Sequence, residues 1–439
     1  MGVLTFCGAC GTVTGSLYLL ESGRKKILID CGLYQGLEAD KLNFSFPFDP
    51  EDIDYVILTH AHLDHSGRLL ELVRDGFRGK IFTVQATIEL LQIVLEDRLH
   101  LEPRIGPKEL ASDVISRCHP VEYDETFGLP GGIRFRLRDA GHILGSAHLE
   151  LWCEGQKFAF SGDIGRTGTP IIRDPSPPDE ADFLIMESTY GGRRHPPLGR
   201  AKRQLKLIIE RAQRENARVF IPSFAIGRAQ ELLYYFNELV ESGEIEPLPV
   251  ILDSPMALKV TRVYARHTEL YDEEALEKLA RGDRIFSFPL FFSTASSEAS
   301  RRIEELSPPY VVIAGSGMVT GGRIIDHLKR HLPERNTFVV FVGFQAKGTP
   351  GREILHRRPW VKLDHELVEN RARIFRIEAF SAHADHRELL SWLDHFDKPP
   401  HRIFLTHGEP EARDTLKRDI QKRFRSRVET PSLGRQFVF

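Results

Sequence analysis

Residues 55–67 read Tyr55-Val-Ile-Leu-Thr-His60-Ala-His62-Leu-Asp64-His65-Ser-Gly67. An apolar run typical of a buried strand is followed at once by three histidines and an aspartate. Side chains on a loop can converge on one point because a loop imposes no fixed side-chain period. Imidazole and carboxylate are ligands that suit zinc and similar divalent ions. The stretch therefore predicts a metal site at the end of a strand.

Further ligands would have to come from other parts of the chain, because one such cluster does not close a site for two ions. Three candidates lie at the ends of predicted strands: His142 in a glycine-flanked turn, Asp163 after residues 157–160, and His407 after residues 402–406. Each is weak by itself, since a lone histidine or aspartate at a strand end is more often a satisfied turn residue. Together they predict a shared rim, because all follow the carboxyl ends of strands as the first cluster does.

The composition is that of a globular protein large enough for two domains, or for one domain interrupted by another. Of 439 residues, 41% are hydrophobic and 28% are charged, and the formal net charge is -3. A charge so close to zero argues neither for nor against a nucleic-acid partner, so RNA or DNA would need a local basic surface. The basic cluster at residues 422–427 is such a surface, or else a solvated terminal strand or turn.

Five cysteines in a long chain argue against a disulfide framework and for a reducing cytoplasm. Cys7 and Cys10 form a Cys-x-x-Cys pair, but no second pair completes a zinc site, and a plain turn explains them better. No apolar stretch is long enough to span a bilayer. We therefore expect a soluble, cytoplasmic protein without a membrane partner.

The first half of the chain is a succession of short predicted strands with few helices between them. The strands cover residues 3–7, 16–20, 26–30, 55–59, 80–84, 133–138, 147–152, 157–161 and 183–187. Helices are predicted only at residues 66–75 and about 87–100. This pattern favours two sheets packed face to face with helices outside, an α/β/β/α sandwich.

From about residue 193 strands and helices alternate. The amphipathic helix 225–241 separates the predicted strands 218–222 and 249–252, and the helix 324–331 separates the strands 310–314 and 337–342. This alternation predicts a mostly parallel α/β domain. Short strands return after residue 373, at 374–379, 402–406 and 436–439. The sequence thus predicts one domain from residues 1–192 and 374–439, interrupted by an inserted domain at residues 193–373.

Taken together, these motifs resemble the metallo-β-lactamase superfamily, in which Asp30, the 60–65 cluster, His142, Asp163 and His407 would occur in this order. Two further motifs resemble its nucleic-acid-processing β-CASP branch: Phe183-Leu-Ile-Met-Glu187-Ser-Thr-Tyr-Gly191 and Phe380-Ser-Ala-His383-Ala-Asp385. The chain is similar to short bacterial β-CASP ribonucleases and to the endonuclease subunit of the pre-mRNA 3′-end cleavage machinery. The resemblance runs from about residue 3 to about residue 410. It implies an αββα sandwich with an inserted, mostly parallel α/β β-CASP domain.

The resemblance implies two Zn²⁺ ions, each held by its own group of three side chains. These groups are His60, His62 and His142 for one ion, and Asp64, His65 and His407 for the other. Asp163 would bridge the two ions. Asp30 would be a carboxylate behind the ligands that orients one of the histidines. The less favoured alternative is that Asp30 is an ordinary buried aspartate in the turn after residues 27–29.

The resemblance also implies hydrolysis of RNA phosphodiester bonds that leaves 5′-phosphate and 3′-hydroxyl ends. Two zinc ions lower the pKa of a shared water toward about 7, and the resulting hydroxide attacks phosphorus in line. We expect His383 to protonate the leaving 3′ oxygen while Glu187 accepts from its other ring nitrogen. Asp64 counts among the catalytic residues as well as the metal ligands. Without the resemblance, Glu187 is an ordinary carboxylate at a strand end.

A glycine-rich segment at residues 315–322 lies between a predicted strand and a predicted helix. It matches neither a phosphate-binding P-loop nor a dinucleotide fingerprint, so a nucleotide cofactor is not expected. Its backbone N–H groups could face a phosphate. We expect Ser316 and Gly317, together with Arg228 and Arg323, to contact the RNA backbone. A plain tight turn explains the glycines equally well.

Two other classes of function compete with a zinc-dependent ribonuclease. The inserted domain of roughly 180 residues and the motifs at Glu187 and His383 argue against a small-molecule hydrolase of the same superfamily. A non-catalytic RNA-binding scaffold is disfavoured because all seven ligand positions are occupied by suitable residues.

Exonucleolytic relatives of the RNase J type generally carry an extra C-terminal domain and a different sequence around the position of His383. This chain ends about thirty residues after His407 and lacks the N-terminal RNA-binding extension of many archaeal relatives. We therefore expect an endonuclease that acts on single-stranded RNA. The RNA target, activity on DNA and the oligomeric state stay open, and a homodimer is compatible with the sequence.

Overall fold

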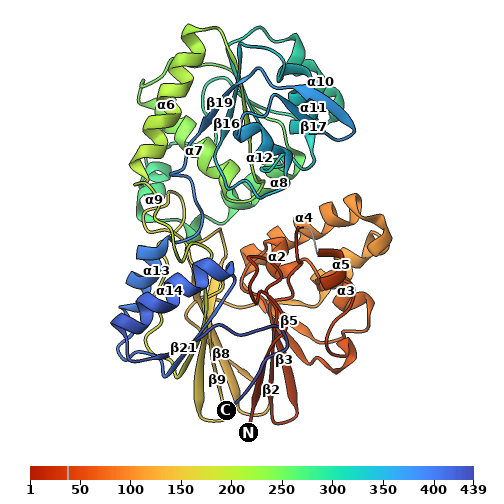
Figure 1. Ribbon diagram of the computed structural model, residues 1–439, viewed down its shortest axis with the longest axis vertical. Helices are drawn as coiled ribbons and strands as arrows, with labels where there is room; N and C mark the ends of the chain where they lie inside the picture. The colour runs from red at the N-terminus through yellow and green to blue at the C-terminus, as the bar shows by residue number, and fades with distance from the viewer. Residues whose placement is uncertain (37–38) are drawn as a thin grey trace. The chain divides into compact units, whose positions relative to one another are not determined.

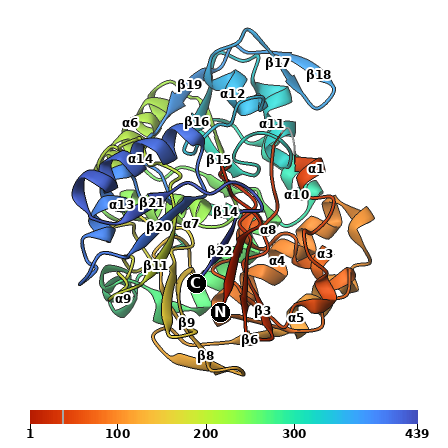
Figure 2. The same ribbon diagram turned by 60° about the horizontal axis from the view of Figure 1, so that its bottom comes forward.

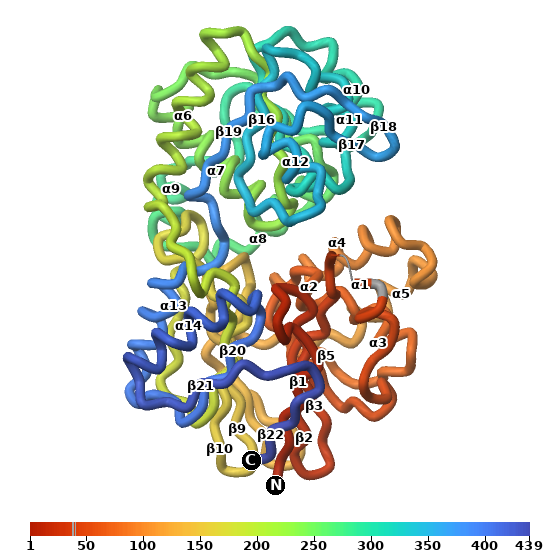
Figure 3. Tube along the Cα trace, in the orientation of Figure 1, coloured from red at the N-terminus to blue at the C-terminus, as the bar shows by residue number. Residues whose placement is uncertain are grey.

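The computed structural model describes residues 1–36 and 39–439 and consists of two compact units. Unit 1 comprises Met1–Thr167, Ile172–Arg194 and His383–Phe439, and unit 2 comprises Gly168–Ile171 and His195–Ala382. The middle of the chain is therefore inserted between two parts of unit 1, as the colours along the tube in Figure 3 show.

Two sheets form the centre of unit 1, each with seven strands among the residues that the structure describes. The first sheet has the order β22 (Gln436–Val438), β1 (Val3–Phe6), β2 (Tyr18–Ser22), β3 (Lys25–Ile29), β4 (Tyr55–Ile57), β5 (Lys80–Thr83) and β6 (Cys118–Pro120). The second has the order β21 (Arg427–Glu429), β20 (Arg402–Thr406), β11 (Phe183–Glu187), β10 (Gln156–Phe160), β9 (Ala147–Cys153), β8 (Ile133–Asp139) and β7 (Thr126–Leu129). Strand β8 shows why they pack face to face, because Ile133, Phe135 and Leu137 are buried while the alternate arginines are not.

Helices cover the two outer faces of this pair of sheets (Figure 1). The helices of unit 1 are α1 (Ala39–Leu42), η1 (Pro50–Asp52), α2 (Leu63–Ser66), α3 (Leu69–Arg74), α4 (Gln85–Leu101), η2 (Pro103–Ile105), α5 (Glu109–Ser116), α13 (His386–Leu393) and α14 (Pro410–Arg423). Leu389 of α13 and Leu416 of α14 are fully buried and share one apolar core with Met186 of the second sheet. Apolar side chains spaced along one helix face thus attach these helices to the sheet.

Parallel strands in both sheets bring loops from distant parts of the chain to a common edge. In the first sheet β3, β4, β5 and β6 run parallel, and in the second β10, β11, β20 and β21 do so. Loops that follow the carboxyl ends of parallel strands meet at the same edge of a sheet. All the predicted metal ligands except His142 follow such a strand, and His142 lies in the connection from β8 to β9.

Unit 2 is built on one sheet in which every pair of neighbouring strands is parallel among the described residues. The strand order is β14 (Phe291–Ser293), β13 (Val250–Leu252), β15 (Tyr310–Ala314), β12 (Arg218–Pro222), β16 (Thr337–Phe341) and β19 (Arg373–Arg376). A hairpin of β17 (Trp360–Leu363) and β18 (Glu366–Glu369) is separate from this sheet. The predicted class, an αββα sandwich with a mostly parallel α/β insertion, is confirmed.

The helices of unit 2 lie on both faces of its sheet, and Figure 2 shows α6 and α11 on opposite sides. They are α6 (Gly199–Arg214), α7 (Arg228–Glu241), α8 (Pro255–Arg266), η3 (Thr268–Leu270), α9 (Glu273–Ala280), α10 (Ser297–Arg301), η4 (Arg302–Glu305), α11 (Arg323–His331) and α12 (Pro350–Leu355). Ile324 and Leu328 of α11 pack with Phe220 and Val339 of the sheet in a fully buried cluster. A parallel sheet needs such cover on both faces, since its strands are buried throughout.

Several elements differ from the sequence-based expectation, and three of them show why. The helix predicted from residue 225 begins at Arg228, after Gly227 with a φ of 78°, a conformation that helices exclude. The strand expected at residues 374–379 in the final part of the first domain is β19, which pairs with β16 and so belongs to unit 2. Helix α6 was not predicted, although its buried residues recur with helical spacing from Ala201 to Ala212.

Candidate metal centre

The 60–65 cluster lies on a loop and a single helical turn after β4. His62 has an extended backbone and is the residue at which α2 begins, so it lies on the loop while Asp64 and His65 lie on the helix. The turn is tightly packed against the chain, because a Cβ atom added to Gly67 would lie 2.6 Å from the carbonyl oxygen of Leu63. The glycine after the ligand cluster is therefore required for the loop to fold back on itself.

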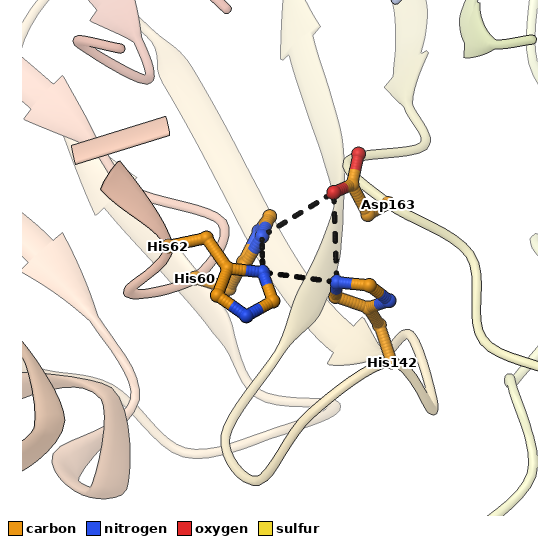
Figure 4. Close-up of side chains that lie close together, drawn as sticks. All are labelled: His60, His62, His142 and Asp163. Atoms are coloured by element: carbon orange, nitrogen blue, oxygen red, sulfur yellow. Dashed lines mark hydrogen bonds and ion pairs between the residues drawn. The ribbon is translucent and has the colours of Figure 1, made fainter. Parts of the chain in front are cut away.

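Three histidines converge on one oxygen of Asp163, as Figure 4 shows. His62 Nδ1 lies 3.2 Å from His60 Nε2 and 3.1 Å from His142 Nε2. Asp163 Oδ2 lies 3.4 Å from His60 Nε2 and 3.5 Å from His142 Nε2. The structure therefore brings together the first predicted group of ligands around one point.

The second predicted group converges on the other oxygen of the same carboxylate. Asp163 Oδ1 lies 3.2 Å from His65 Nε2 and 3.5 Å from His407 Nδ1. His407 Nε2 lies 3.2 Å from His65 Nε2 and 3.5 Å from Asp64 Oδ2. All seven predicted ligands thus belong to two groups that share Asp163.

The chemistry of this donor set fits metal ions on both sides of Asp163. Both carboxylate oxygens of Asp163 are buried, and neither accepts a hydrogen bond from any residue that the structure describes. An ionised carboxylate in such a place costs several kcal/mol unless a cation compensates it. A tetrahedral zinc with bonds of about 2.0–2.1 Å separates its ligand atoms by roughly 3.3–3.4 Å. The spacings of 3.1–3.5 Å within the two groups are of that size.

Asp30 lies behind the second group and contacts one of its histidines. His65 Nδ1 donates to Asp30 Oδ2 at 2.6 Å, which leaves Nε2 directed at the metal position. The other oxygen, Asp30 Oδ1, accepts from the backbone N–H and the hydroxyl of Thr59, both at 2.9 Å. Asp30 is buried and has a φ of 59°, so its carboxylate is held by the fold in an uncommon backbone conformation.

Burial and charge act differently on the members of the two groups. Burial lowers the pKa of His60 and of His142, and it lowers the pKa of His62 to about 3. Burial also opposes a charge on His65, but the carboxylates of Asp163 and Asp30 outweigh it and raise the pKa of His65. The first three histidines are therefore neutral at physiological pH, which is the form that binds a metal.

Glu187 and His383 lie beside the first group. His383 Nδ1 is 3.3 Å from Glu187 Oε1 and 3.9 Å from Asp163 Oδ2. Glu187 is fully buried at the end of β11, and its Oε1 also accepts from Ile164 N at 2.6 Å. Burial opposes a charge on His383, but Glu187 and Asp163 outweigh it and raise the pKa of His383 to about 9.

Three stretches of the chain match known families. Residues 10–222 match the Metallo-beta-lactamase superfamily, residues 229–354 the Beta-Casp domain, and residues 368–431 the Zn-dependent metallo-hydrolase RNA specificity domain. "Ribonuclease TTHA0252" of Thermus thermophilus is 40% identical over 406 residues, which cover 92% of each chain. The chain belongs to the β-CASP branch of the metallo-β-lactamase superfamily.

Other comparisons agree with this assignment. "Transcription termination factor FttA" of Methanocaldococcus jannaschii is 31% identical to this β-CASP protein over 95% of the chain and 69% of the relative. The protein of the same name from Methanosarcina mazei is 29% identical over 98% and 70%. A crystal structure of a protein of unknown function from Enterococcus faecalis shares the fold at 14% identity, with a TM-score of 0.60 and full coverage of both chains.

The family and the site together make this β-CASP protein a metal-dependent hydrolase of RNA. The predicted family, the predicted enzyme class and the predicted RNA substrate are confirmed. Among the described residues, no helix combines the length and the apolar character needed to cross a membrane.

The four residues predicted to contact RNA all lie in unit 2 of the β-CASP protein, and three of their side chains already have partners. Arg323 pairs with the buried Asp253 at 2.7 Å, and Arg228 is buried in an ion pair with Glu231. Ser316 Oγ accepts from the backbone N–H groups of residues 320 and 321 at 2.8 and 3.2 Å. The fourth residue, Gly317, packs against an aromatic ring.

Two residues of the centre were missed from the sequence. Thr59 contacts both Asp30 and His60, with 3.1 Å between its hydroxyl and His60 Nδ1. Thr189 Oγ1 lies 3.1 Å from His407 Nδ1. Both threonines adjoin a recognised motif, so adjacency was the available signal, but a threonine hydroxyl fits many local roles.

Proposed function

We propose that this chain is a two-zinc endoribonuclease that cleaves single-stranded RNA and leaves 5′-phosphate and 3′-hydroxyl ends. The observation that carries the proposal is the buried carboxylate of Asp163. Its two oxygens face two separate groups of ligands and accept no hydrogen bond from the residues that the structure describes. Histidine and carboxylate donors at tetrahedral spacing support zinc as the metal.

The two groups of ligands would each hold one ion, with His60, His62 and His142 around the first. Bound zinc would supply Lewis acidity that activates a water and neutralises charge on the phosphoryl oxygens. Asp64 would both bind the second ion and add negative charge to the centre. Asp30 would keep His65 in the orientation and tautomer that direct Nε2 toward the metal.

His383 would protonate the 3′ oxygen as it leaves. A general acid must be protonated at working pH, and the raised pKa of about 9 meets that requirement. Its Nδ1 faces Glu187, so the proton to be transferred would be the one on Nε2. Glu187 is held in turn by the backbone N–H of Ile164, and this support would keep the imidazole ring in one orientation.

Endonucleolytic cleavage rests on the resemblance to the pre-mRNA cleavage subunit and on the ribonuclease relative. The second candidate is a 5′-exoribonuclease of the RNase J type, and the third is a small-molecule hydrolase of the superfamily. Contact of RNA with Arg228, Ser316, Gly317 and Arg323 also remains a proposal. Because both arginines already pair with carboxylates, a phosphate would have to share them.

The test is cleavage of single-stranded RNA by wild type, His383→Ala and His395→Ala, with zinc quantified in each protein. His395 is an exposed histidine of the same unit whose Nδ1 hydrogen-bonds to the carbonyl oxygen of Ser391, so it is the matched control. RNA labelled at its 5′ end distinguishes internal cuts from stepwise release of mononucleotides. We expect two zincs per chain in all three proteins.

We expect internal cuts by wild type and His395→Ala, and a loss of about 100-fold to 10,000-fold in kcat for His383→Ala. Stepwise release of 5′ mononucleotides would overturn the endonuclease proposal and keep the nuclease. Full activity of His383→Ala would remove that residue from the mechanism. Wild type that carries two zincs but leaves RNA intact would overturn the proposed function.

A further inference from the structure

Phe224 is an exposed aromatic side chain at the carboxyl edge of the sheet in unit 2. It follows β12, which lies between β15 and β16 in the middle of the sheet, and 42% of the residue is exposed. Large aromatic residues at the end of a central strand normally pack inward. In open parallel α/β sheets, ligands bind beyond the carboxyl ends of the strands. The position of Phe224 is therefore one where a ligand would be met.

Two glycines lie beside one side of this ring. A Cβ atom added to Gly317, in the loop after β15, would lie 2.8 Å from Cδ2 of Phe224. A Cβ atom added to Gly343, in the loop after β16, would lie 3.5 Å from Cε2 of the same ring. Glycines in the loops after both neighbouring strands thus leave space for the ring of Phe224. Only a residue without a side chain fits at position 317 while the ring keeps this place.

A buried glutamine connects the two glycine segments. The side-chain Nε2 of Gln345 donates to the carbonyl oxygens of Gly317 and Gly343, at 2.9 and 3.3 Å. Gln345 is fully buried, so these bonds are shielded from water. The two glycine segments are therefore held in place before any ligand binds, and so is the ring that they support. A ring that is already fixed loses little entropy on binding.

Several polar groups of the glycine-rich loop form hydrogen bonds within the loop. Ser316 N donates to the carbonyl oxygen of Gly321 at 2.9 Å, and Ser316 Oγ accepts from the backbone of Thr320 and Gly321. The loop thus uses these groups to close on itself and to support Phe224. Beside this loop the ring of Phe224 is an exposed aromatic surface. A second exposed aromatic, Phe344, follows β16, and 41% of it is exposed.

We propose that the ring of Phe224 is a stacking platform for one base of the single-stranded RNA substrate. The inference rests on the proposed function, because RNA is the ligand of this enzyme that presents flat aromatic groups. Stacking on an aromatic side chain is tolerant of sequence, since every base has a π face. Phenylalanine has no hydrogen-bonding group, so the platform holds a base without reading its identity.

The test compares binding of two oligonucleotides to zinc-loaded protein by fluorescence anisotropy. One is an oligouridylate with phosphorothioate linkages that resist hydrolysis, and the other is an abasic chain of the same length and linkage. The variants are Phe224→Ala, Phe224→Trp and Gly317→Ala. Trp360→Ala is the matched control, because Trp360 is an aromatic residue on the separate hairpin of the same unit and is even more exposed than Phe224. Zinc content and thermal unfolding report whether each variant is folded.

We expect Phe224→Ala to weaken binding of the oligouridylate by about 10-fold to 100-fold and to leave the abasic chain unaffected. Phe224→Trp keeps a ring and should bind as wild type does, while Gly317→Ala should weaken binding because its Cβ displaces the ring. Trp360→Ala should change neither affinity. Equal losses of affinity for both oligonucleotides, or an unchanged affinity of Phe224→Ala, would overturn the proposal that Phe224 is a stacking platform.

Failure of this inference is distinguishable from failure of the proposed function. Wild type that cleaves RNA, together with a Phe224→Ala variant that binds it normally, would leave the nuclease and remove the platform. A base-dependent loss of binding in Phe224→Ala, with no cleavage by wild type, would keep the platform and remove the nuclease. If wild type cleaves RNA but binds neither oligonucleotide, the platform is overturned and the nuclease stands; if it neither binds nor cleaves, both proposals are overturned.

Discussion

Asp163 in unit 1 and Asp253 in unit 2 occupy comparable places, since each is a buried aspartate just after a strand at the carboxyl edge of its sheet. Their surroundings differ. Both oxygens of Asp253 are satisfied, one by Arg323 at 2.7 Å and the other by Ser300 at 2.6 Å and His327 at 2.7 Å. Neither oxygen of Asp163 accepts a hydrogen bond from the residues that the structure describes.

The comparison separates a structural carboxylate from one that needs a ligand. Burial opposes ionisation of Asp253, but its hydrogen bonds outweigh burial and hold its pKa well below the ordinary value. The fold itself therefore compensates the charge. Around Asp163 the neighbours are imidazole rings, whose nitrogens can either carry protons or bind a metal ion, so a bound metal can take over the compensation of its charge. The carboxyl edges of the two sheets thus have similar strand geometry, but the aspartate has a structural role in unit 2 and a candidate metal-binding role in unit 1.

The largest effect is expected for Asp163→Asn. An amide cannot bridge two cations through two anionic oxygens, so we expect zinc to fall below two per chain. Ribonuclease activity should fall by about a thousandfold or more, because the metals contribute several kcal/mol of transition-state stabilisation. Metal analysis and cleavage assays check this. A variant that retains two zincs and near-normal activity would contradict the bridging role.

Asp253→Asn should lower the stability of the fold and leave the zinc content unchanged. It removes the buried counter-ion of the partly exposed Arg323 and a hydrogen-bond acceptor of the buried His327, and breaking a buried ion pair typically costs about 3–5 kcal/mol. Zinc content should stay at the wild-type value, because no metal ligand lies in unit 2. Denaturant unfolding and metal analysis measure the two quantities. Loss of zinc without loss of stability would erase the distinction between the two aspartates.

A smaller effect is expected for Asp30→Asn, which tests support of a ligand rather than ligation itself. The amide weakens the bond to His65 Nδ1, and changes of this kind cost about 10-fold to 100-fold in metal affinity. Activity should recover when zinc is in excess. A titration of the metal-depleted protein with zinc gives the affinity. An affinity equal to that of wild type would make Asp30 an ordinary buried turn residue.

The smallest effect concerns Asp139, a third buried carboxylate in unit 1. Burial raises its pKa to about 7, although a hydrogen bond from Gly141 N at 2.9 Å opposes the rise. The folded state therefore holds a proton that the unfolded state releases near pH 4, so this group lowers stability as the pH rises toward 7. Asp139→Asn removes that dependence.

Relative to wild type, metal-free Asp139→Asn should be about 1–2 kcal/mol more stable at pH 8 than at pH 6. Denaturant unfolding at the two pH values measures the difference. If the difference in stability between Asp139→Asn and wild type is the same at the two pH values, Asp139 is ionised throughout this pH range. Asp139 would then resemble Asp253, with its charge compensated by the fold.

Much of the fold was predictable from short-range patterns. Alternating apolar residues indicated the strands of unit 1, and the helical spacing before Glu241 indicated α7. The assignment of β19 was not predictable in this way, because a short strand carries no local mark of its partner, and only pairing with β16 places it in unit 2. The basic cluster at residues 422–427 was left open, and it is divided between the end of α14 and β21.

The ligand residues could be recognised in the chain because metal chemistry restricts the residue types and strand ends restrict their places. The sequence did not show which atoms come together. The two oxygens of Asp163 are distinguished only by the histidines that follow β4, β8 and β20 and lie beside them. The same holds for Phe224, which reads as an ordinary apolar residue until the glycines after β15 and β16 leave its ring exposed. Contacts between residues far apart in sequence depend on chain topology, and no local pattern encodes them.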